Sequence, residues 1–301
     1  MPASRVTTSD VKNKPIGVFD SGLGGLTVAR AIATGLPHES VYFVGDTKRC
    51  PYGPRAQSEV RLFVRQVGSW LAEREVKAVV IACNTATAAG LDVLQRMLDV
   101  PVIGVIQPGA RAAVQATRTR RVGVLATDGT VRSGAYVRAI RGLDAGVEVF
   151  PCAAPEFVQI VEDELAGGTH LHEDWMRNKE IFYTDEVRAT VSRVVEPLRQ
   201  KDIDTVVLGC THFPLLSVEI REALGGDVKI VSSAEETCLE LEETLRRRGD
   251  LAGEDVTPVH RFATTSDDIT TFAVAGRFVF GQQLDSIERI DLGDLEALTD
   301  E

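Results

Sequence analysis

The sequence lacks several features that would assign it to a specialised class of protein. Its five cysteines include no Cys-x-x-Cys pair, which argues against a disulfide framework and a paired zinc site. No apolar run reaches the roughly 18 residues of a membrane-spanning helix, and residues 1–14 lack the apolar stretch of a secretion signal. Basic residues are outnumbered, with 33 Lys and Arg against 44 Asp and Glu and a net charge of -11. These absences argue against nucleic-acid or membrane binding, and we expect a cytoplasmic protein with reduced thiols.

Short apolar runs alternate with segments of helical spacing along most of the chain. This alternation predicts an α/β fold with mostly parallel sheets flanked by helices. The expected strands are residues 15–19, 40–45, a run ending at 83, 102–106, 121–125, 146–152, a run ending at 210, 229–231 and 259–264. The expected helices are residues 26–36, 58–75, 87–98, 131–141, 157–165, 180–199 and 234–248.

A degenerate internal repeat indicates two similar lobes. Residues 16–22 resemble residues 122–129, and each segment opens a half that later reaches a cysteine at a strand end. We expect the ligand site in the crevice between the lobes. The expected boundaries are a mobile tail at 1–14, a discontinuous first lobe at 15–105 plus 213–285, a second lobe at 106–212, and a solvated acidic segment at 286–301.

The two strand-end cysteines are the most informative feature. Residues 78–85 read AVVIACNT and residues 205–212 read TVVLGCTH. A single cysteine at such a place is as readily a small buried hydrophobic residue as a functional one. Two in equivalent places favour function, because open α/β sheets bind ligands beyond the carboxyl ends of their strands. Thiols on opposite faces of a small ligand suit an enzyme that moves a proton from one face of a carbon to the other.

Polar side chains beside the thiols extend this prediction. His212 lies two residues from Cys210, so both point to the same side of an extended segment, where an imidazole lowers a thiol pKa. Asp20 ends the first strand, where a carboxylate can hold an ammonium group or orient an acid–base partner. The hydroxyl and amide donors suited to a carboxylate ligand are Asn84, Thr85, Thr127, Thr130 and Thr211.

Two loops and the histidines permit simpler interpretations. The glycine-rich turn at 20–25 matches neither G-x-G-x-x-G nor a P-loop, so we expect a tight turn there and no nucleotide site. The loop at 46–53 is a polar turn in which Tyr52 and Gly53 can offer backbone N–H groups to a carboxylate. His38, His170, His172 and His260 do not form a metal-binding pattern.

Four motifs together resemble those of the glutamate racemases. They are DSGLGGLTV at 20–28, GDT with PYG within 45–53, CNTA at 83–86 and GCTHFPL at 209–215, and the resemblance runs from about residue 15 to 280. It implies cofactor-independent interconversion of L- and D-glutamate, with D-glutamate feeding peptidoglycan synthesis in a bacterial cytosol. It also implies a homodimer.

The resemblance assigns roles residue by residue. Cys83 would take the proton from D-glutamate and Cys210 from L-glutamate, with Asp20 assisting the first thiol and His212 the second. Glu162 matches an acidic position near the histidine. The implied substrate-binding residues are Ser21, Asp46, Tyr52, Gly53, Asn84, Thr85, Thr127, Thr130 and Thr211.

Departures and alternatives remain. Residues 152–159 read CAAPEFVQ where the family often has Cys-Pro-x-Phe-Val-Pro, and Gln107 stands where an acidic residue often precedes Pro-Gly. An aspartate racemase or related two-cysteine isomerase would share the fold and mechanism. A non-catalytic two-lobe binding protein and a thiol redox protein are further alternatives, and the lack of Cys-x-x-Cys weakens the latter.

Overall fold

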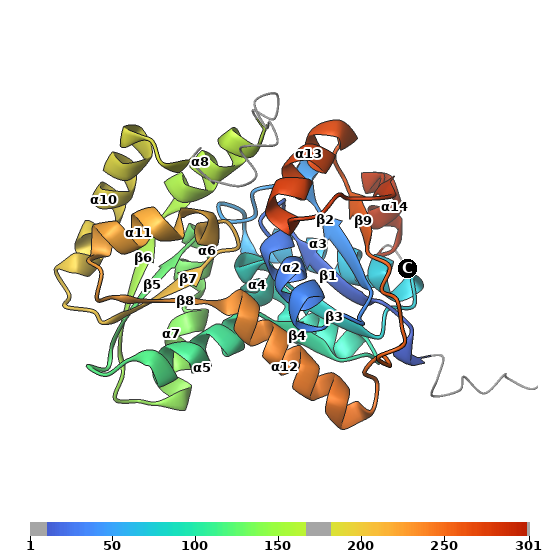
Figure 1. Ribbon diagram of the computed structural model, residues 1–301, viewed down its shortest axis with the longest axis horizontal. Coiled ribbons are helices and arrows are strands. Elements are labelled where there is room, and N and C mark those ends of the chain that lie inside the picture. Colours follow the sequence, from blue (N-terminus) through green and yellow to red (C-terminus); the bar gives the residue numbers. More distant parts are fainter. Residues whose placement is uncertain (1–10, 167–181, 300–301) are drawn as a thin grey trace, which may run out of the picture.

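Two parallel β-sheets, each flanked by helices, build the molecule (Figure 1). The computed structural model describes residues 11–166 and 182–299. The first sheet has the strand order β10-β9-β2-β1-β3-β4, and the second has the order β6-β5-β7-β8. These strands are β1 (Ile16–Asp20), β2 (Val41–Gly45), β3 (Ala78–Ile81), β4 (Val102–Gly104), β5 (Arg121–Ala126), β6 (Glu148–Ala153), β7 (Thr205–Gly209), β8 (Lys229–Ser232), β9 (Arg261–Thr264) and β10 (Ile287–Arg289).

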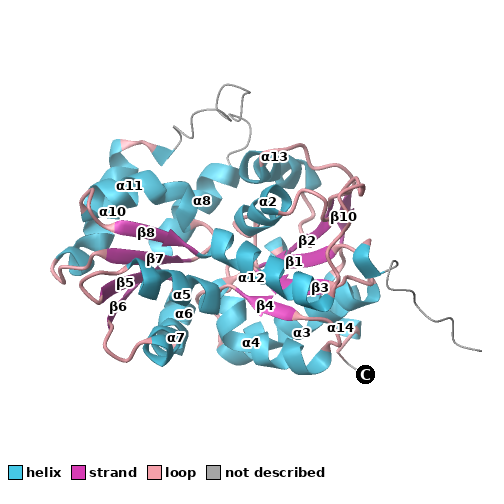
Figure 2. Ribbon diagram, turned by 60° about the horizontal axis from the view of Figure 1, so that its bottom comes forward, coloured by secondary structure: helices cyan, strands magenta, loops and turns pink. Residues whose placement is uncertain are grey.

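Helices supply the crossovers that parallel strands require, and they cover the faces of the sheets (Figure 2). The α-helices are α2 (Leu26–Gly35), α3 (Gln57–Glu73), α4 (Asn84–Met97), α5 (Ile106–Ala116), α6 (Asp128–Ser133), α7 (Ala135–Leu143), α8 (Pro155–Ala166), α10 (Asp185–Arg199), α11 (Ser217–Leu224), α12 (Ser233–Arg248), α13 (Ile269–Phe280) and α14 (Leu292–Ala297). Two short 3₁₀ helices are η1 (Thr47–Arg49) and η4 (Phe213–Leu216). The predicted α/β class with two sheets is confirmed.

Strand pairing differs from the expected lobe composition in two places. β8 pairs with β7, with Leu208 opposite Ser232, so residues 229–232 belong to the second sheet and not to the first lobe as expected. β10 pairs with β9 in the first sheet, and α14 buries Leu295 completely. The segment expected to be a solvated acidic end therefore contributes a strand and a packed helix. Such pairings join residues distant in sequence, which local patterns do not specify.

Two smaller differences have local causes. The helix expected at 131–141 is broken into α6 and α7 at Gly134, whose φ of 65° lies in the left-handed region. The second difference is that the end of the predicted tail is held in place, because the Lys77 ammonium donates to the Lys12 carbonyl at 2.6 Å. Lys77 also forms a buried ion pair with Glu39, with an Nζ–Oε2 distance of 2.6 Å. Residues 1–10 lie outside the described part of the chain.

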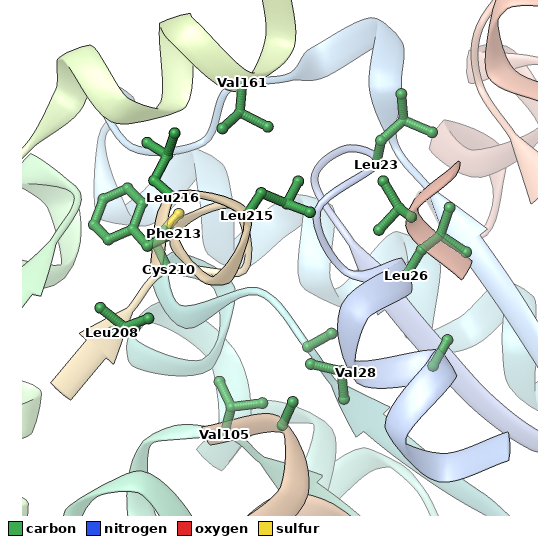
Figure 3. Close-up of a cluster of buried hydrophobic side chains, with 14 of the residues drawn as sticks. Leu23, Leu26, Val28, Val105, Val161, Leu208, Cys210, Phe213, Leu215 and Leu216 are labelled. Carbon is green, nitrogen blue, oxygen red and sulfur yellow. The ribbon is translucent and has the colours of Figure 1, made fainter. Parts of the chain in front are cut away.

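A continuous apolar core joins the two lobes. Figure 3 shows Leu23 and Leu26 of the first lobe around the same space as Val161 and Leu215 of the second. Cys210 lies in this cluster, so one of the two thiols is set in the core that connects the lobes. No helix in residues 11–166 and 182–299 is long and apolar enough to cross a membrane.

Candidate active site

Both strand-end thiols line one small cavity between the two sheets. Cys83 follows β3 and caps the N-terminus of α4, whereas Cys210 comes directly after β7. Because the strands within each sheet are parallel, their carboxyl ends lie at one edge of that sheet. The loops that follow these ends in both sheets line the same crevice. The cavity has a volume of about 20 Å³, room for roughly one water molecule, so the groups around it are closely packed. Its lining residues are Ser21, Pro51, Tyr52, Gly53, Cys83, Asn84, Thr85, Thr127, Val158, Cys210, Thr211 and His212.

Cys83 lies on the carboxylate side of the cavity. Its sulfur accepts a hydrogen bond from the Ala86 backbone N–H at 3.4 Å and lies 3.7 Å from the Ser21 hydroxyl. Burial, and then the nearby Asp20 carboxylate, raise the pKa of the Cys83 thiol far above its usual value. Without a ligand, Cys83 therefore holds its proton and can act as an acid.

Asp20 is fully buried behind this thiol. Its Oδ2 atom accepts from the backbone N–H groups of Gly22 at 3.1 Å and Gly25 at 3.0 Å, and Oδ1 accepts from the Thr211 hydroxyl at 3.3 Å. Burial raises the pKa of Asp20, while the His212 charge and the two backbone donors oppose that rise. The carboxylate is thus held in one orientation by donors from both lobes.

Cys210 lies on the cationic side of the cavity. Its sulfur is 3.6 Å from Nδ1 of His212, whose Nε2 is 2.5 Å from Oε1 of Glu162. Burial opposes the charged imidazole, but the hydrogen bonds to Cys210 and Glu162 raise the pKa of His212 well above its usual value. Although burial works against it, the hydrogen bond from His212 lowers the pKa of Glu162. An imidazolium fixed in this way is both a proton source and a counter-ion for a thiolate.

The glycine-rich turn allows these groups to pack closely. A Cβ atom on Gly25 would lie 2.2 Å from Cβ of Asp20, and one on Gly24 would lie 2.6 Å from Nδ1 of His212. Any larger residue would displace the acid–base groups. The turn serves close side-chain packing, and none of its glycines has the positive φ for which a tight turn would require glycine.

Neutral donors dominate the rest of the cavity, and its lining contains no Lys or Arg. The hydroxyls of Thr85 and Thr127 are 2.8 Å apart, and that of Thr130 lies 3.0 Å from Thr127. The Asn84 side chain accepts from the Tyr136 hydroxyl at 2.8 Å, and its Nδ2 is buried with no partner among the described residues. An anionic ligand would therefore be held by hydroxyl, amide and backbone donors.

Four residues from the predicted set lie behind the lining. Asp20, Thr130 and Glu162 contact lining residues, as described above. Asp46 is buried and accepts from Arg49 Nε at 2.6 Å, from Thr265 at 3.0 Å, and from the Tyr52 hydroxyl. Its oxygens are occupied, so Asp46 holds Tyr52 in place and does not reach the cavity. The other ten predicted residues line the cavity.

Sequence reasoning missed several neighbours of the site. Pro51 and Val158 line the cavity, and Tyr136 on α7 lies behind the lining, where it contacts Asn84. Cys50 places its sulfur 3.9 Å from Oε1 of Glu162. Cys50 and Pro51 lie in the loop already singled out, but no local pattern marks Tyr136, whose partner is 52 residues away.

Two other features of the described residues do not combine acid–base groups in the way this cavity does. A larger hollow between α2, α12 and α13, with a volume of about 550 Å³, has Cys238 as the one thiol among its described lining residues. His38 bonds the Val256 carbonyl at 3.2 Å, and His170 and His172 lie outside the described residues. Within the described residues no group of three His, Cys, Asp or Glu side chains is placed to hold a metal ion.

Comparisons with known proteins identify relatives of this chain. Residues 24–241 match the family model described as Asp/Glu/Hydantoin racemase. A glutamate racemase of Lysinibacillus sphaericus is 43% identical over 280 residues, which cover 93% of this chain and 99% of that protein. A crystal structure of a glutamate racemase isoform from Bacillus anthracis superposes with a TM-score of 0.84 at 43% identity, covering 93% of this chain and 98% of that one. A glutamate racemase from Francisella tularensis, solved with D-glutamate, has a TM-score of 0.82 at 29% identity, with 93% and 98% covered.

Proposed function

The chain belongs to the Asp/Glu/Hydantoin racemase family, and we propose that it interconverts L-glutamate and D-glutamate. The observation that carries the proposal is the pair of thiols, Cys83 and Cys210, that reach one small cavity from two different sheets. A racemase must remove a proton from one face of Cα and return one to the other face, which two separate acid–base groups accomplish. The D-glutamate formed would supply peptidoglycan synthesis.

Each direction uses the two thiols in opposite states. From D-glutamate, the Cys83 thiolate takes the Cα proton and the Cys210 thiol delivers its own proton to the opposite face. From L-glutamate, the Cys210 thiolate takes the proton and Cys83 delivers one. The substrate gains and loses one proton in each turnover, and the enzyme is left in the opposite protonation state.

The neighbouring groups support this exchange of states. Asp20 lies behind Cys83, where it favours the protonated thiol. Beside Cys210, His212 provides positive charge and relays protons, and Glu162 holds the imidazole in place. The negative charge that develops at Cα is met by oriented donors of the cavity, and the substrate carboxylates are bound by donors such as Asn84, whose Nδ2 has no partner among the described residues. Fixed donors in an enclosed cavity act more strongly than water would.

Hydroxyl, amide and backbone donors of the cavity would bind the two carboxylates of the substrate, because no Lys or Arg side chain of the described residues lines the cavity. Proton transfer between two thiols requires no electron-sink cofactor, so we expect none. Aspartate, one methylene shorter, is the alternative substrate, because a pocket of this chemistry would bind its carboxylates as well. Family membership also leads us to infer a cytoplasmic homodimer, which sedimentation measurements would test.

Proton NMR of L-glutamate in D2O, combined with polarimetry, tests the function directly. We expect the Cα–H signal and the optical rotation to disappear together, with rates unchanged by added pyridoxal phosphate or a metal chelator. Cys152→Ser is the control for serine variants of the two cavity thiols. Cys152 is a half-buried thiol in β6 whose sulfur contacts the Val194 carbonyl at 3.4 Å, outside the cavity. If neither glutamate nor aspartate loses its signal, the protein is a binding relative and the proposal fails.

A further inference from the structure

Tyr136 connects the segments that carry the two thiols. It lies on α7 in the second lobe and is 2% exposed. Its hydroxyl donates to Oδ1 of Asn84 at 2.8 Å, and Asn84 is the residue after Cys83 in the first lobe. Its ring packs so closely on Gly209, the residue before Cys210, that a Cβ there would lie 3.0 Å from the ring. One side chain therefore contacts both strand ends.

This contact decides which way the Asn84 amide faces. The Tyr136 hydroxyl donates to Oδ1 of Asn84, because an amide oxygen can only accept. Burial raises the pKa of Tyr136, which keeps that proton in place. With Oδ1 bound to Tyr136, Nδ2 of Asn84 points away from it, and that atom is buried without a partner in residues 11–166 and 182–299.

An unpartnered buried donor is costly unless a ligand satisfies it. Asn84 lines the cavity, and the ligand proposed for that cavity carries two carboxylates. The hydrogen bond from Tyr136 thus occupies Oδ1 of Asn84 and leaves an N–H group of this lining residue available to a ligand.

We propose that Tyr136 is a positioning residue for substrate recognition, because it holds the Asn84 amide so that Nδ2 donates to a carboxylate oxygen of the bound amino acid. The inference rests on the proposed function of the cavity and extends it to a residue outside the lining. Tyr136 acts through Asn84 and does not touch the reacting atoms.

The Tyr136→Phe variant removes the hydroxyl and keeps the ring against Gly209. We expect KM for glutamate to rise on the order of tenfold, the effect of losing one buried hydrogen bond, while kcat changes by less than about threefold. Calorimetric titration with D-glutamate should show the same loss of affinity. Tyr42→Phe is the matched control, because Tyr42 is a buried tyrosine that donates to Glu288, away from the cavity.

A double-mutant cycle separates positioning from a general structural role. In an Asn84→Ala background, Tyr136→Phe should cause no further rise in KM, because the amide on which it acts is gone. If the phenylalanine substitution raises KM equally in both backgrounds, or does not raise it in the parent, the inference is wrong.

Asn84→Asp tests the same geometry should Tyr136→Phe fail to fold. A carboxylate still accepts from Tyr136 but offers no donor to the ligand, so KM should rise at least as much as in Asn84→Ala, with the melting temperature retained. Wild-type affinity in Asn84→Asp would overturn the inference. A wild-type protein that neither racemises nor binds glutamate would overturn the proposed function itself, whereas an active wild type with unaffected variants would overturn only the role of Tyr136.

Discussion

Gly24→Ala is the substitution for which the structure predicts the sharpest separation of folding from activity. Gly24 lies in the turn between β1 and α2, and it has space only for hydrogen on the side facing His212. An added Cβ would lie 2.6 Å from Nδ1 of His212 and 2.7 Å from Oγ1 of Thr211. Non-bonded contacts settle near 3.5 Å, so relief requires a movement of roughly 1 Å.

The imidazole has no free direction for such a movement. His212 is 2% exposed, and its far nitrogen is 2.5 Å from Glu162. Overpacking of this kind costs about 1–3 kcal/mol of unfolding free energy. A displacement of about 1 Å in an acid–base group lowers turnover on the order of 100-fold. We therefore expect a protein that folds with reduced stability and racemises glutamate about two orders of magnitude more slowly.

Polarimetry of glutamate and urea unfolding measure the two effects. Gly142→Ala is the control, because Gly142 lies in α7 and its added Cβ would meet no atom within 4 Å. That variant should keep full activity and gain about 0.5–1 kcal/mol, as expected for alanine in place of glycine within a helix. Turnover of Gly24→Ala within threefold of the wild type would refute the argument that close packing at this turn positions His212.

Three further predictions concern the thiols and two ion pairs. Cys83→Ser and Cys210→Ser should each lower kcat at least about 100-fold with little change in circular dichroism, and a rate within tenfold of the wild type would contradict the two-base assignment. In the folded state the pKa of His212 is raised and that of Glu162 is lowered. Their pair therefore stabilises the fold most between the ordinary pKa values of glutamate and histidine, about 4.3 and 6.5. This stabilisation is lost as the pH rises through the folded pKa of His212 or falls through that of Glu162. The difference in melting temperature between wild type and Glu162→Gln should therefore peak near pH 5–6, and a pH-independent difference would show that the pair is not charged. Lys77→Met leaves its buried glutamate partner unpaired and should cost about 3–5 kcal/mol in urea unfolding; a loss below about 1 kcal/mol would mean that water reaches the pair.

The electrostatic asymmetry of the cavity gives each thiol its own partner. A carboxylate lies behind Cys83, and an imidazole held by a second carboxylate lies beside Cys210. Groups coupled this closely titrate together, so the pH dependence of the rate belongs to the set and not to single residues. The proposed mechanism needs the two thiols in opposite states at each turnover, and unlike surroundings make such a distribution of protons accessible.

Local patterns in the sequence determined the α/β class and most of the cavity lining. The runs ending at Cys83 and Cys210 are buried strands. The carboxyl ends of the strands in a parallel sheet all lie at one edge, which is the edge where ligands bind. Strand and helix periodicity depends on neighbouring residues, so it can be read without the fold. The residues directly after each strand, such as Asn84 and Thr211, followed from the same reasoning.

Contacts between distant residues were decided only by the tertiary structure. β8 lies in the second sheet and β10 in the first because each pairs with a strand that is separated from it by an intervening helix. Asp46 became a support for Tyr52, and Tyr136 became a partner of Asn84. The sequence placed chemical groups at the ends of strands because that placement is local, whereas which group faces the ligand and which holds another in place depends on the packing of the two lobes against each other.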